Sequence, residues 1–290
     1  MFRSNYLEKK FMPNKNILII LHLIGLSLFA VTSMYGQGNL LVSPKRLVFD
    51  GNKKNLEINL ANTGTDTSRY LVSIMEIRMK EDGSFEEIKE PDAGQNFSSK
   101  YLRFFPRSVS LGPNEAQTIK VQLVKADKLA PGEYRSHIYF RAIPKEKPLG
   151  ENAEQTKDSS IVVKLTPVFG ITIPAIIRVG ESNTKVNFTD AAFNIVGDTI
   201  PRINMSINRT GNMSTYGNIL VDLVANNGTT TQVGSANGVA VYTPNTLRRF
   251  AFDLDKSKKI NYHSGKLHVT YQSESADNPV KLAEYDIPLH

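Results

Sequence analysis

The segment from Ser160 to Ala175 carries the pattern that most constrains the fold of this chain. Every second residue in it is apolar, in the order Ile161, Val163, Leu165, Pro167, Phe169, Ile171 and Ile173. A period of two places these side chains on one face of an extended strand. The run is about twice as long as an ordinary strand. Such a strand either lies wholly in its own core or leaves part of its apolar face for another chain to cover.

Residues 1–36 predict a secretory signal peptide rather than part of the fold. Basic residues precede an apolar run from Ile17 to Val31, and small or polar residues then lead to Gly36. This run is shorter than the about 20 apolar residues that a membrane-spanning helix needs. We therefore expect cleavage near Gly36, export of the mature chain, and no membrane insertion after cleavage.

Composition excludes several classes of function. The chain contains no cysteine, which rules out disulfide frameworks, thiolate metal sites and cysteine nucleophiles. Of the net charge of +7, residues 1–36 contribute +3, so the mature chain carries only +4. Charges of both signs are interspersed along it, which does not resemble the basic footprint of a protein that binds nucleic acid.

From Leu40 onward the chain predicts an all-β fold. Short alternating runs are separated by turn residues such as Asp82-Gly83 and Pro131-Gly132, and only Lys125–Leu129 suggests a helical turn. Such spacing favours two immunoglobulin-like β-sandwich domains in tandem. A polar connector near Ile177–Asn183 places the N-terminal domain at 37–178 and the C-terminal β-sandwich domain at 179–290, after the signal at 1–36.

The N-terminal domain resembles the periplasmic pilus-assembly (fimbrial) chaperone family, the PapD-like chaperones. The most specific match is FFPRSVSLGPNEAQTIKVQL at 104–123, which resembles the strand, turn and strand of that family. Four other stretches match in the expected order: VSPKRLVFDG at 42–51, LEINLANTG at 56–64, YLVSIMEI at 70–77 and LAPGEYRSHIYFRAIP at 129–144. The resemblance covers about 40–175, and residues 180–290 agree with it only in class and length.

This resemblance implies a non-enzymatic chaperone of the periplasm. Members of the family bind secreted pilus or surface-protein subunits by lending them a strand, which prevents aggregation before assembly, and an outer-membrane usher is a further partner. By analogy the donor strand residues here are Ile161, Val163 and Leu165. The later residues Phe169, Ile171 and Ile173 are then expected in the core of the chain itself.

The family also holds the terminal carboxylate of the subunit on two basic residues. Arg46 matches the arginine of the first strand, and a guanidinium can take a carboxylate with two parallel hydrogen bonds. In the family, the second base is a lysine on the long strand, a few residues before a proline. When the two are aligned on Pro174, Phe169 stands at that position in this chain. Lys164 is the only lysine on the strand and lies on its opposite face. It is the candidate for a second basic contact, and another base or a different mode of docking stays open.

The sequence offers no support for catalysis, a cofactor or a metal site. His263 and His268 lack the spacing of zinc ligands, and His137 is expected as a buried histidine of the sandwich. No nucleophile elbow, phosphate loop or dinucleotide fingerprint occurs. Two alternatives to the chaperone stay open: a structural or interaction module of the cell envelope that retains the chaperone fold, and a glycan- or peptide-binding accessory.

Overall fold

The structure is a computed structural model that describes residues 40–50, 53–144, 167–256, 260–275 and 278–289, all within one compact unit that spans Asn39–His290. The described chain is almost entirely β-structure, with two short 3₁₀ turns, η1 (Ser99–Tyr101) and η2 (Ala126–Lys128). The helical turn predicted at 125–129 is therefore confirmed. Among the described residues no helix is long and apolar enough to cross a membrane.

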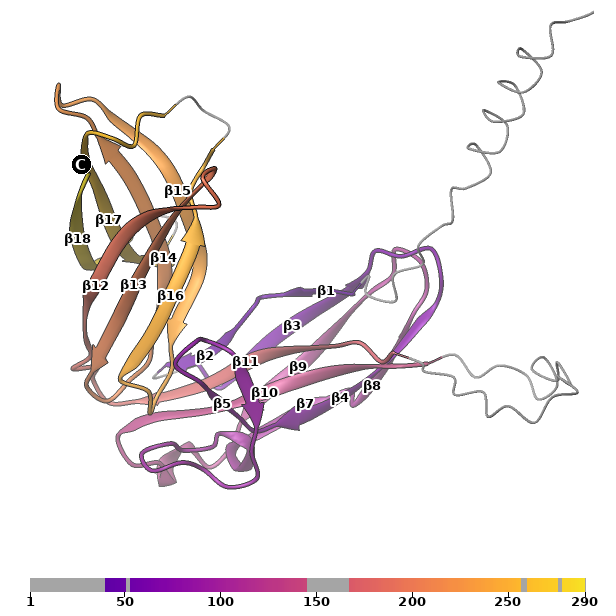
Figure 1. The fold of residues 1–290 in the computed structure, drawn as a ribbon. Coiled ribbons are helices and arrows are strands. Elements are labelled where there is room, and N and C mark those ends of the chain that lie inside the picture. Colours follow the sequence, from indigo (N-terminus) through magenta and orange to yellow (C-terminus); the bar gives the residue numbers. More distant parts are fainter. Residues whose placement is uncertain (1–39, 51–52, 145–166, 257–259, 276–277, 290) are drawn as a thin grey trace, which may run out of the picture. The chain divides into compact units, whose positions relative to one another are not determined.

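The first sandwich has two facing sheets (Figure 1). One sheet has the order β1 (Leu40–Ser43), β3 (Asn55–Asn62), β9 (Ala116–Leu123), β7 (Leu102–Phe105). The other has the order β2 (Leu47–Asp50), β11 (Gly170–Val179), β10 (Gly132–Ile143), β4 (Ser68–Met75), β8 (Ser108–Leu111). A hairpin of β5 (Ile77–Met79) and β6 (Phe85–Glu87) extends from the second sheet. Alternate residues of both sheets, such as Ile58, Ile119, Ile138 and Phe140, fill one buried core.

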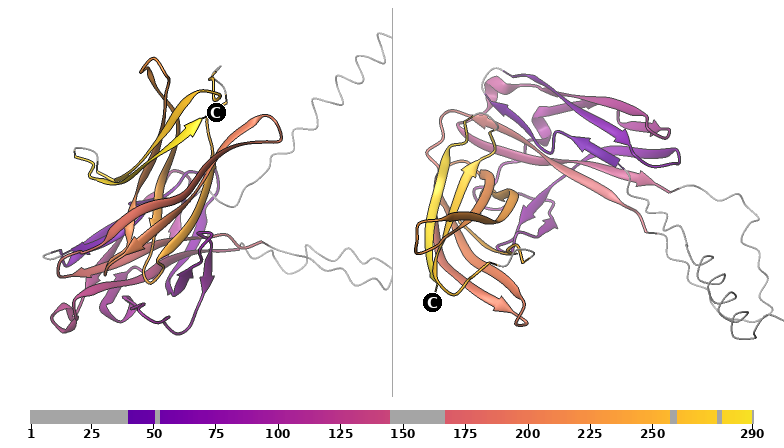
Figure 2. Two further views of the ribbon diagram at one scale, coloured as in Figure 1. Left: turned by 60° about the vertical axis from the view of Figure 1, so that its left-hand side comes forward. Right: turned by 90° about the horizontal axis from the view of Figure 1, so that it is seen from above.

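The second sandwich also consists of two layers of strands (Figure 2). One sheet has the order β12 (Lys185–Val196), β13 (Ile200–Thr210), β16 (Leu247–Asp253). The other has the order β15 (Thr230–Val241), β14 (Thr215–Val224), β17 (Gly265–Ser273), β18 (Lys281–Leu289). Strict alternation on β13 buries Ile203, Met205 and Ile207 against a second core.

The order of the strands in each sandwich is that of an immunoglobulin fold. In the first sandwich the sheet β1-β3-β9-β7 has the A-B-E-D order, and the other sheet contains the G-F-C order as β11-β10-β4. The predicted fold class, two immunoglobulin-like β-sandwiches in tandem, is thus confirmed. The boundary at 178/179 between two separately folding domains stays a prediction.

Two edge strands of the first sandwich change sheets midway. β1 belongs to the four-stranded sheet and β2 to the five-stranded sheet, although only Pro44, Lys45 and Arg46 separate them. Likewise Pro106 and Arg107 separate β7 from β8. Proline has no N–H to donate to a ladder, so a strand does not run on through it with all its hydrogen bonds. The first of these changes determines what remains uncovered beside β11.

Candidate functional site

Strand β11 has one edge that is only partly covered. On one side it pairs with β10 along its whole length, from Gly170 opposite Arg141 to Val179 opposite Gly132. On the other side it pairs with β2 in parallel, and only over Ala175–Arg178. No other described strand pairs with Gly170–Pro174 on that side. The change of sheet between β1 and β2 thus leaves about half of the β11 edge open.

The backbone groups that face this open edge can be assigned from the ladder. The Ala142 N–H donates to the Phe169 carbonyl at 2.9 Å, so the backbone of Phe169 points toward β10. Because orientation alternates along a strand, Ile171 and Ile173 also point toward β10, whereas Gly170 and Thr172 point to the open edge. Pro174 has no N–H. Thr172 is therefore the central residue of the edge, with both its N–H and its carbonyl turned outward.

The side chains along this segment change from buried to exposed as the chain is followed toward residue 167. Ile173 is buried and Ile171 packs against the first core, as predicted. Phe169, also predicted as a core residue, is 47% exposed, and Val168 is 41% exposed. The prediction for Phe169 was wrong because β10 ends at Ile143, so the sheet stops beside it. The predicted donor residues Ile161, Val163 and Leu165, and the candidate base Lys164, lie outside the described residues.

A second feature is the outer face of the five-stranded sheet, which faces away from the first core. The register of β2, β11 and β10 places side chains on it in three rows. Val48 stands next to Ile176 and Arg135, Asp50 next to Arg178 and Glu133, and Pro174 next to His137, with Arg46 just before the start of β2. We call this surface, with Arg46, Arg135 and Arg178 on it, the arginine face. Residues of the second sandwich cover it, since Ile176 and Val48 pack with Ala240 and Tyr242.

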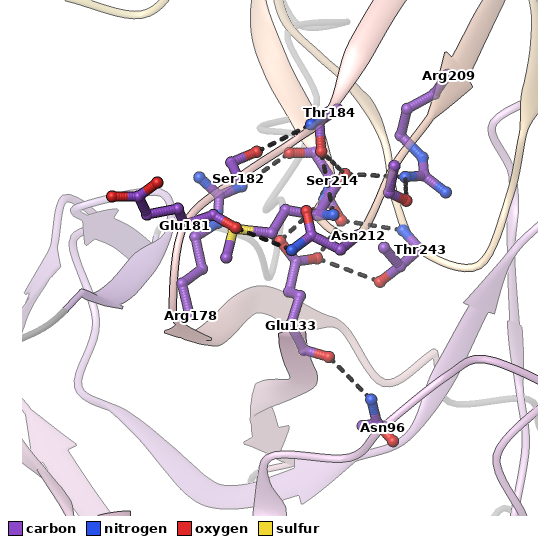
Figure 3. Close-up of polar contacts among 12 residues, drawn as sticks. Asn96, Glu133, Arg178, Glu181, Ser182, Thr184, Arg209, Asn212, Ser214 and Thr243 are labelled. Carbon is purple, nitrogen blue, oxygen red and sulfur yellow. Dashed lines mark hydrogen bonds and ion pairs between the residues drawn. The ribbon is translucent and has the colours of Figure 1, made fainter. Parts of the chain in front are cut away.

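Glu133 is the polar centre of the arginine face (Figure 3). Its side chain is fully buried and accepts from Arg178 Nε at 3.1 Å, from the Ser214 backbone N–H at 3.0 Å, and from the hydroxyl groups of Ser214 and Thr243. Arg178 Nη2 in turn donates to the Ser214 carbonyl at 2.8 Å. A carboxylate with this many donors is well compensated for its burial. Glu133 thus ties β10 and β11 to the second sandwich.

Arg46 lies half-buried at the rim of the arginine face. Its guanidinium carbon stacks 4.0 Å from the centre of the Tyr216 ring, and its Nε is buried without a hydrogen-bond partner. Burial lowers the pKa of the guanidinium, and the neighbouring Tyr242 acts in the opposite direction. The structure therefore presents a cation with an unused donor at the position predicted as the carboxylate anchor. Whether a carboxylate binds there stays a prediction.

Arg135 lies deeper in the same face and was not singled out from the sequence. The residue is only 2% exposed, and its guanidinium carbon lies 4.5 Å from the centre of the Tyr242 ring. Nη2 donates to the Thr243 carbonyl at 3.3 Å, but Nε and Nη1 are buried without a partner. The available sign was the alternation of Glu133, Arg135 and His137, three polar residues at a period of two on β10.

The histidines offer no metal site in the described part of the chain. His137 is buried as predicted and packs against the rings of Phe85 and Tyr242, but its Nδ1 has no hydrogen-bond partner. His268 lies on β17 with Nδ1 2.7 Å from Asp286. No group of three or more metal-binding side chains occurs among the residues that the structure describes.

Comparison with known proteins gives similarity in structure only. No protein-family profile and no curated protein matches the chain. Among solved structures, the YadV chaperone matches 87% of this chain and 100% of its own, with 12% identity and a TM-score of 0.43. The CupB2 chaperone of Pseudomonas aeruginosa matches 86% and 100%, with 12% identity and a TM-score of 0.41.

A third solved structure is the CsuC–CsuE chaperone–tip adhesion subunit pre-assembly complex from the archaic Csu pili of Acinetobacter baumannii. It matches 84% of this chain and 98% of its own, with 10% identity and a TM-score of 0.43. The chain is thus similar to chaperones of fimbriae, the class that its sequence motifs resemble. At these identities and TM-scores the likeness assigns neither a function nor a site residue.

Proposed function

We propose that this protein is a periplasmic chaperone that binds secreted pilus or surface-protein subunits along the open edge of β11. The observation that carries this proposal is the unpaired stretch Gly170–Pro174. An open edge is a template for a further strand, and a strand added there gains main-chain hydrogen bonds. In this proposal Ile161, Val163 and Leu165 extend the same edge and fill the groove of the subunit.

The residues along the open edge of β11 favour pairing with another strand and lack the features that prevent such pairing. Edge strands that must stay unpaired usually carry charges or proline. The edge strand β18 follows that rule, with Lys281, Glu284, Asp286 and Pro288 in nine residues. The stretch from Leu165 to Ile177 contains no charged residue at all. Its exposed end, Val168 and Phe169, offers apolar surface that a partner would cover.

The other parts of the proposal follow from the same picture. Arg46 anchors the terminal carboxylate of the subunit, and Lys164 is a second basic contact if the strand brings it near. The signal peptide is removed near Gly36, an outer-membrane usher receives the subunit, and no cofactor takes part. The protein performs no catalysis in this role.

One experiment tests the edge directly. The mature protein is recovered from its native envelope as wild type, Thr172→Pro and Thr172→Val, and the co-purified proteins are identified by mass spectrometry. Proline removes the outward N–H of residue 172, whereas valine keeps it, so only the proline variant should lose the subunits, by at least about tenfold. Unfolding midpoints show whether both variants are folded.

Two results would count against the proposal. Equal recovery of subunits by the proline and valine variants would mean that the edge is not the binding site. A wild-type protein that brings down no secreted β-subunit would instead favour the envelope module, which keeps the fold without lending a strand.

A further inference from the structure

Strand β11 begins with a glycine at the point where its open edge has least support. Gly170 is exposed, and β10 is the only described strand that pairs with it. Its N–H and carbonyl point to the open edge, so they hold no partner on β10. A glycine within a strand also lacks a side chain that could pack, which weakens the strand at that residue. The backbone of Gly170 therefore needs support from another residue to stay in line with the sheet.

The side chain of Tyr139 lies over Gly170 and fills this gap. On the ladder of β10 and β11, Tyr139 stands opposite Thr172, and Arg141 stands opposite Gly170. The ring of Tyr139 thus leans along a diagonal of two residues, which an aromatic side chain can span. A Cβ atom added to Gly170 would overlap with Cε2 of the ring and lie 2.6 Å from the hydroxyl oxygen. The ring occupies the space that a side chain at residue 170 would take.

The contact with Tyr139 accounts for the glycine at residue 170. The three atoms nearest to an added Cβ all belong to Tyr139. The φ angle of Gly170 lies outside the left-handed region, so the backbone conformation does not require a glycine. Gly170 and Tyr139 therefore form one unit, in which the glycine makes room for the ring and the ring replaces the missing side chain. In β-sheets this arrangement is an aromatic rescue of an edge glycine.

The position of Tyr139 indicates that the ring supports the edge and does not fill the core. Ile138 and Phe140, its neighbours on β10, belong to the first core. Because side chains alternate along a strand, Tyr139 projects from the opposite face, where it is only half-buried. A tyrosine on that face contributes nothing to the packing of the core. Its close contact is with the one residue of the open edge that has no side chain.

We propose that Tyr139 is a positioning residue of the open edge. Its ring holds the outward N–H and carbonyl of Gly170 in line with those of Thr172, so that an added strand finds two consecutive pairing sites already in place. This inference rests on the proposed function, because only a strand that pairs with β11 would use these groups. Keeping them ordered before binding lowers the entropy that a partner must overcome.

The first part of the test uses the full mature protein without any subunit. In wild type the ¹⁵N order parameter of the Gly170 amide should be near about 0.85, the value of rigid backbone. Tyr139→Val keeps a β-branched residue but is too short to reach Gly170, so the order parameter should fall below about 0.6. The Ala142 N–H, which donates to the Phe169 carbonyl at 2.9 Å, should exchange faster in that variant. Tyr139→Phe retains the ring and should behave as wild type.

The second part measures the secreted subunits that co-purify from the native envelope, quantified by mass spectrometry. Tyr139→Val should recover at least about fivefold less subunit than wild type, because the edge is no longer ordered before binding. The double variant Tyr139→Val/Gly170→Thr replaces the ring by a side chain on β11 itself, so it should regain both the order parameter and the recovery. Tyr285→Val, at an exposed tyrosine of β18, is the matched control and should change neither.

Four results would overturn the proposal. A mobile Gly170 in wild type, or an unchanged order parameter in Tyr139→Val, would show that the ring does not hold the edge. The wild-type measurement is decisive even if the valine variant does not fold. Loss of order without loss of subunits would show that binding does not depend on it. A double variant that regains order but not subunits would show that Tyr139 acts in another way.

These failures can be told apart from failure of the proposed function. If Thr172→Pro loses the subunits while Tyr139→Val keeps them, the edge of β11 remains the binding site and only the role of Tyr139 is lost. If Thr172→Pro and Thr172→Val recover subunits equally, the edge is not the binding site, and both proposals fall together.

Discussion

Glu133 and Arg178 stand directly opposite each other on the antiparallel strands β10 and β11, and their side chains form an ion pair with 3.1 Å between Oε2 and Nε. The pair points away from the first core and toward Ser214 of the second sandwich. This cross-strand pair is thus one of the contacts that join the sheet with the open edge to the second sandwich.

Removing the charge of Glu133 should destabilise the protein strongly. Glu133→Gln keeps the shape of the side chain but leaves Arg178 without its counter-charge, and breaking a buried pair in this way costs about 3 kcal/mol or more. The free energy of unfolding measured in urea should fall by that amount. Glu57→Gln, at an exposed position of β3, is the control and should stay within about 0.5 kcal/mol of wild type. A Glu133 variant as stable as this control would show that the pair is dispensable.

Stability should decrease as the solution becomes more acidic, because of His137. Burial, and secondly the nearby charge of Arg135, hold the pKa of His137 well below 6.5 in the folded protein. Below pH 6.5 the unfolded chain takes up a proton that the folded chain does not, so protonation favours unfolding by up to about 1.4 kcal/mol per pH unit. Urea unfolding of wild type and His137→Gln from pH 7.5 to 5 measures this contribution.

The dependence of the unfolding free energy on pH that His137 causes should disappear in His137→Gln. It should persist in His263→Gln, since His263 is exposed. If the slope is the same in all three proteins, other groups are responsible for it.

Replacing Arg46 should weaken the binding of subunits with little effect on folding. Arg46→Met keeps the apolar stem against Tyr216 and loses mainly a cation–π contact, worth about 1 kcal/mol at a half-buried site. We expect at least about tenfold less subunit to co-purify and a nearly unchanged melting temperature. Lys45→Met, the exposed neighbour, serves as the control. Wild-type recovery of subunits by the Arg46 variant would remove Arg46 from the proposed anchor.

Charges on the proposed donor residues should abolish binding while the free protein still folds. Ile161→Asp or Val163→Asp would place a carboxylate in an apolar groove of the subunit, which is too costly to be tolerated. Val162→Asp, on the other face of the same stretch, is the matched control. Recovery of subunits and thermal unfolding are measured side by side. An Ile161 or Val163 variant that is itself unfolded would identify that residue as part of the core instead.

Alternation of apolar residues predicted many of the strands. The runs on β3, β9, β13 and β14 alternate with a period of two because one side of each strand faces a core. β12 and β15 show this alternation less clearly, since their middle parts, such as Asp190-Ala191-Ala192 and Gly234-Ser235-Ala236, are small or polar. Both are edge strands of their sheets, where fewer side chains need to pack into the core.

The candidate site was predicted only in part, for a similar reason. Arg46 could be identified from a local motif, and its position beside β11 follows from four residues of register. Glu133 and Arg135 look like solvated residues of a strand, because nothing local in the sequence shows that a second sandwich covers that face. Burial of this kind arises from tertiary packing, and a period-two pattern cannot distinguish it from exposure to water.

The crossover at Pro44 has a consequence for how such a protein could evolve or be redesigned. A first strand that paired with β11 along its whole length would leave no open edge there. Because this chain pairs with β3 before Pro44 and with β11 only after it, part of the β11 edge stays open, and the position of the crossover sets the length of that open stretch. Moving the crossing point by two residues toward the N-terminus should shorten the open stretch of β11 by two residues, which would change the length of edge available for pairing without a substitution on β11 itself.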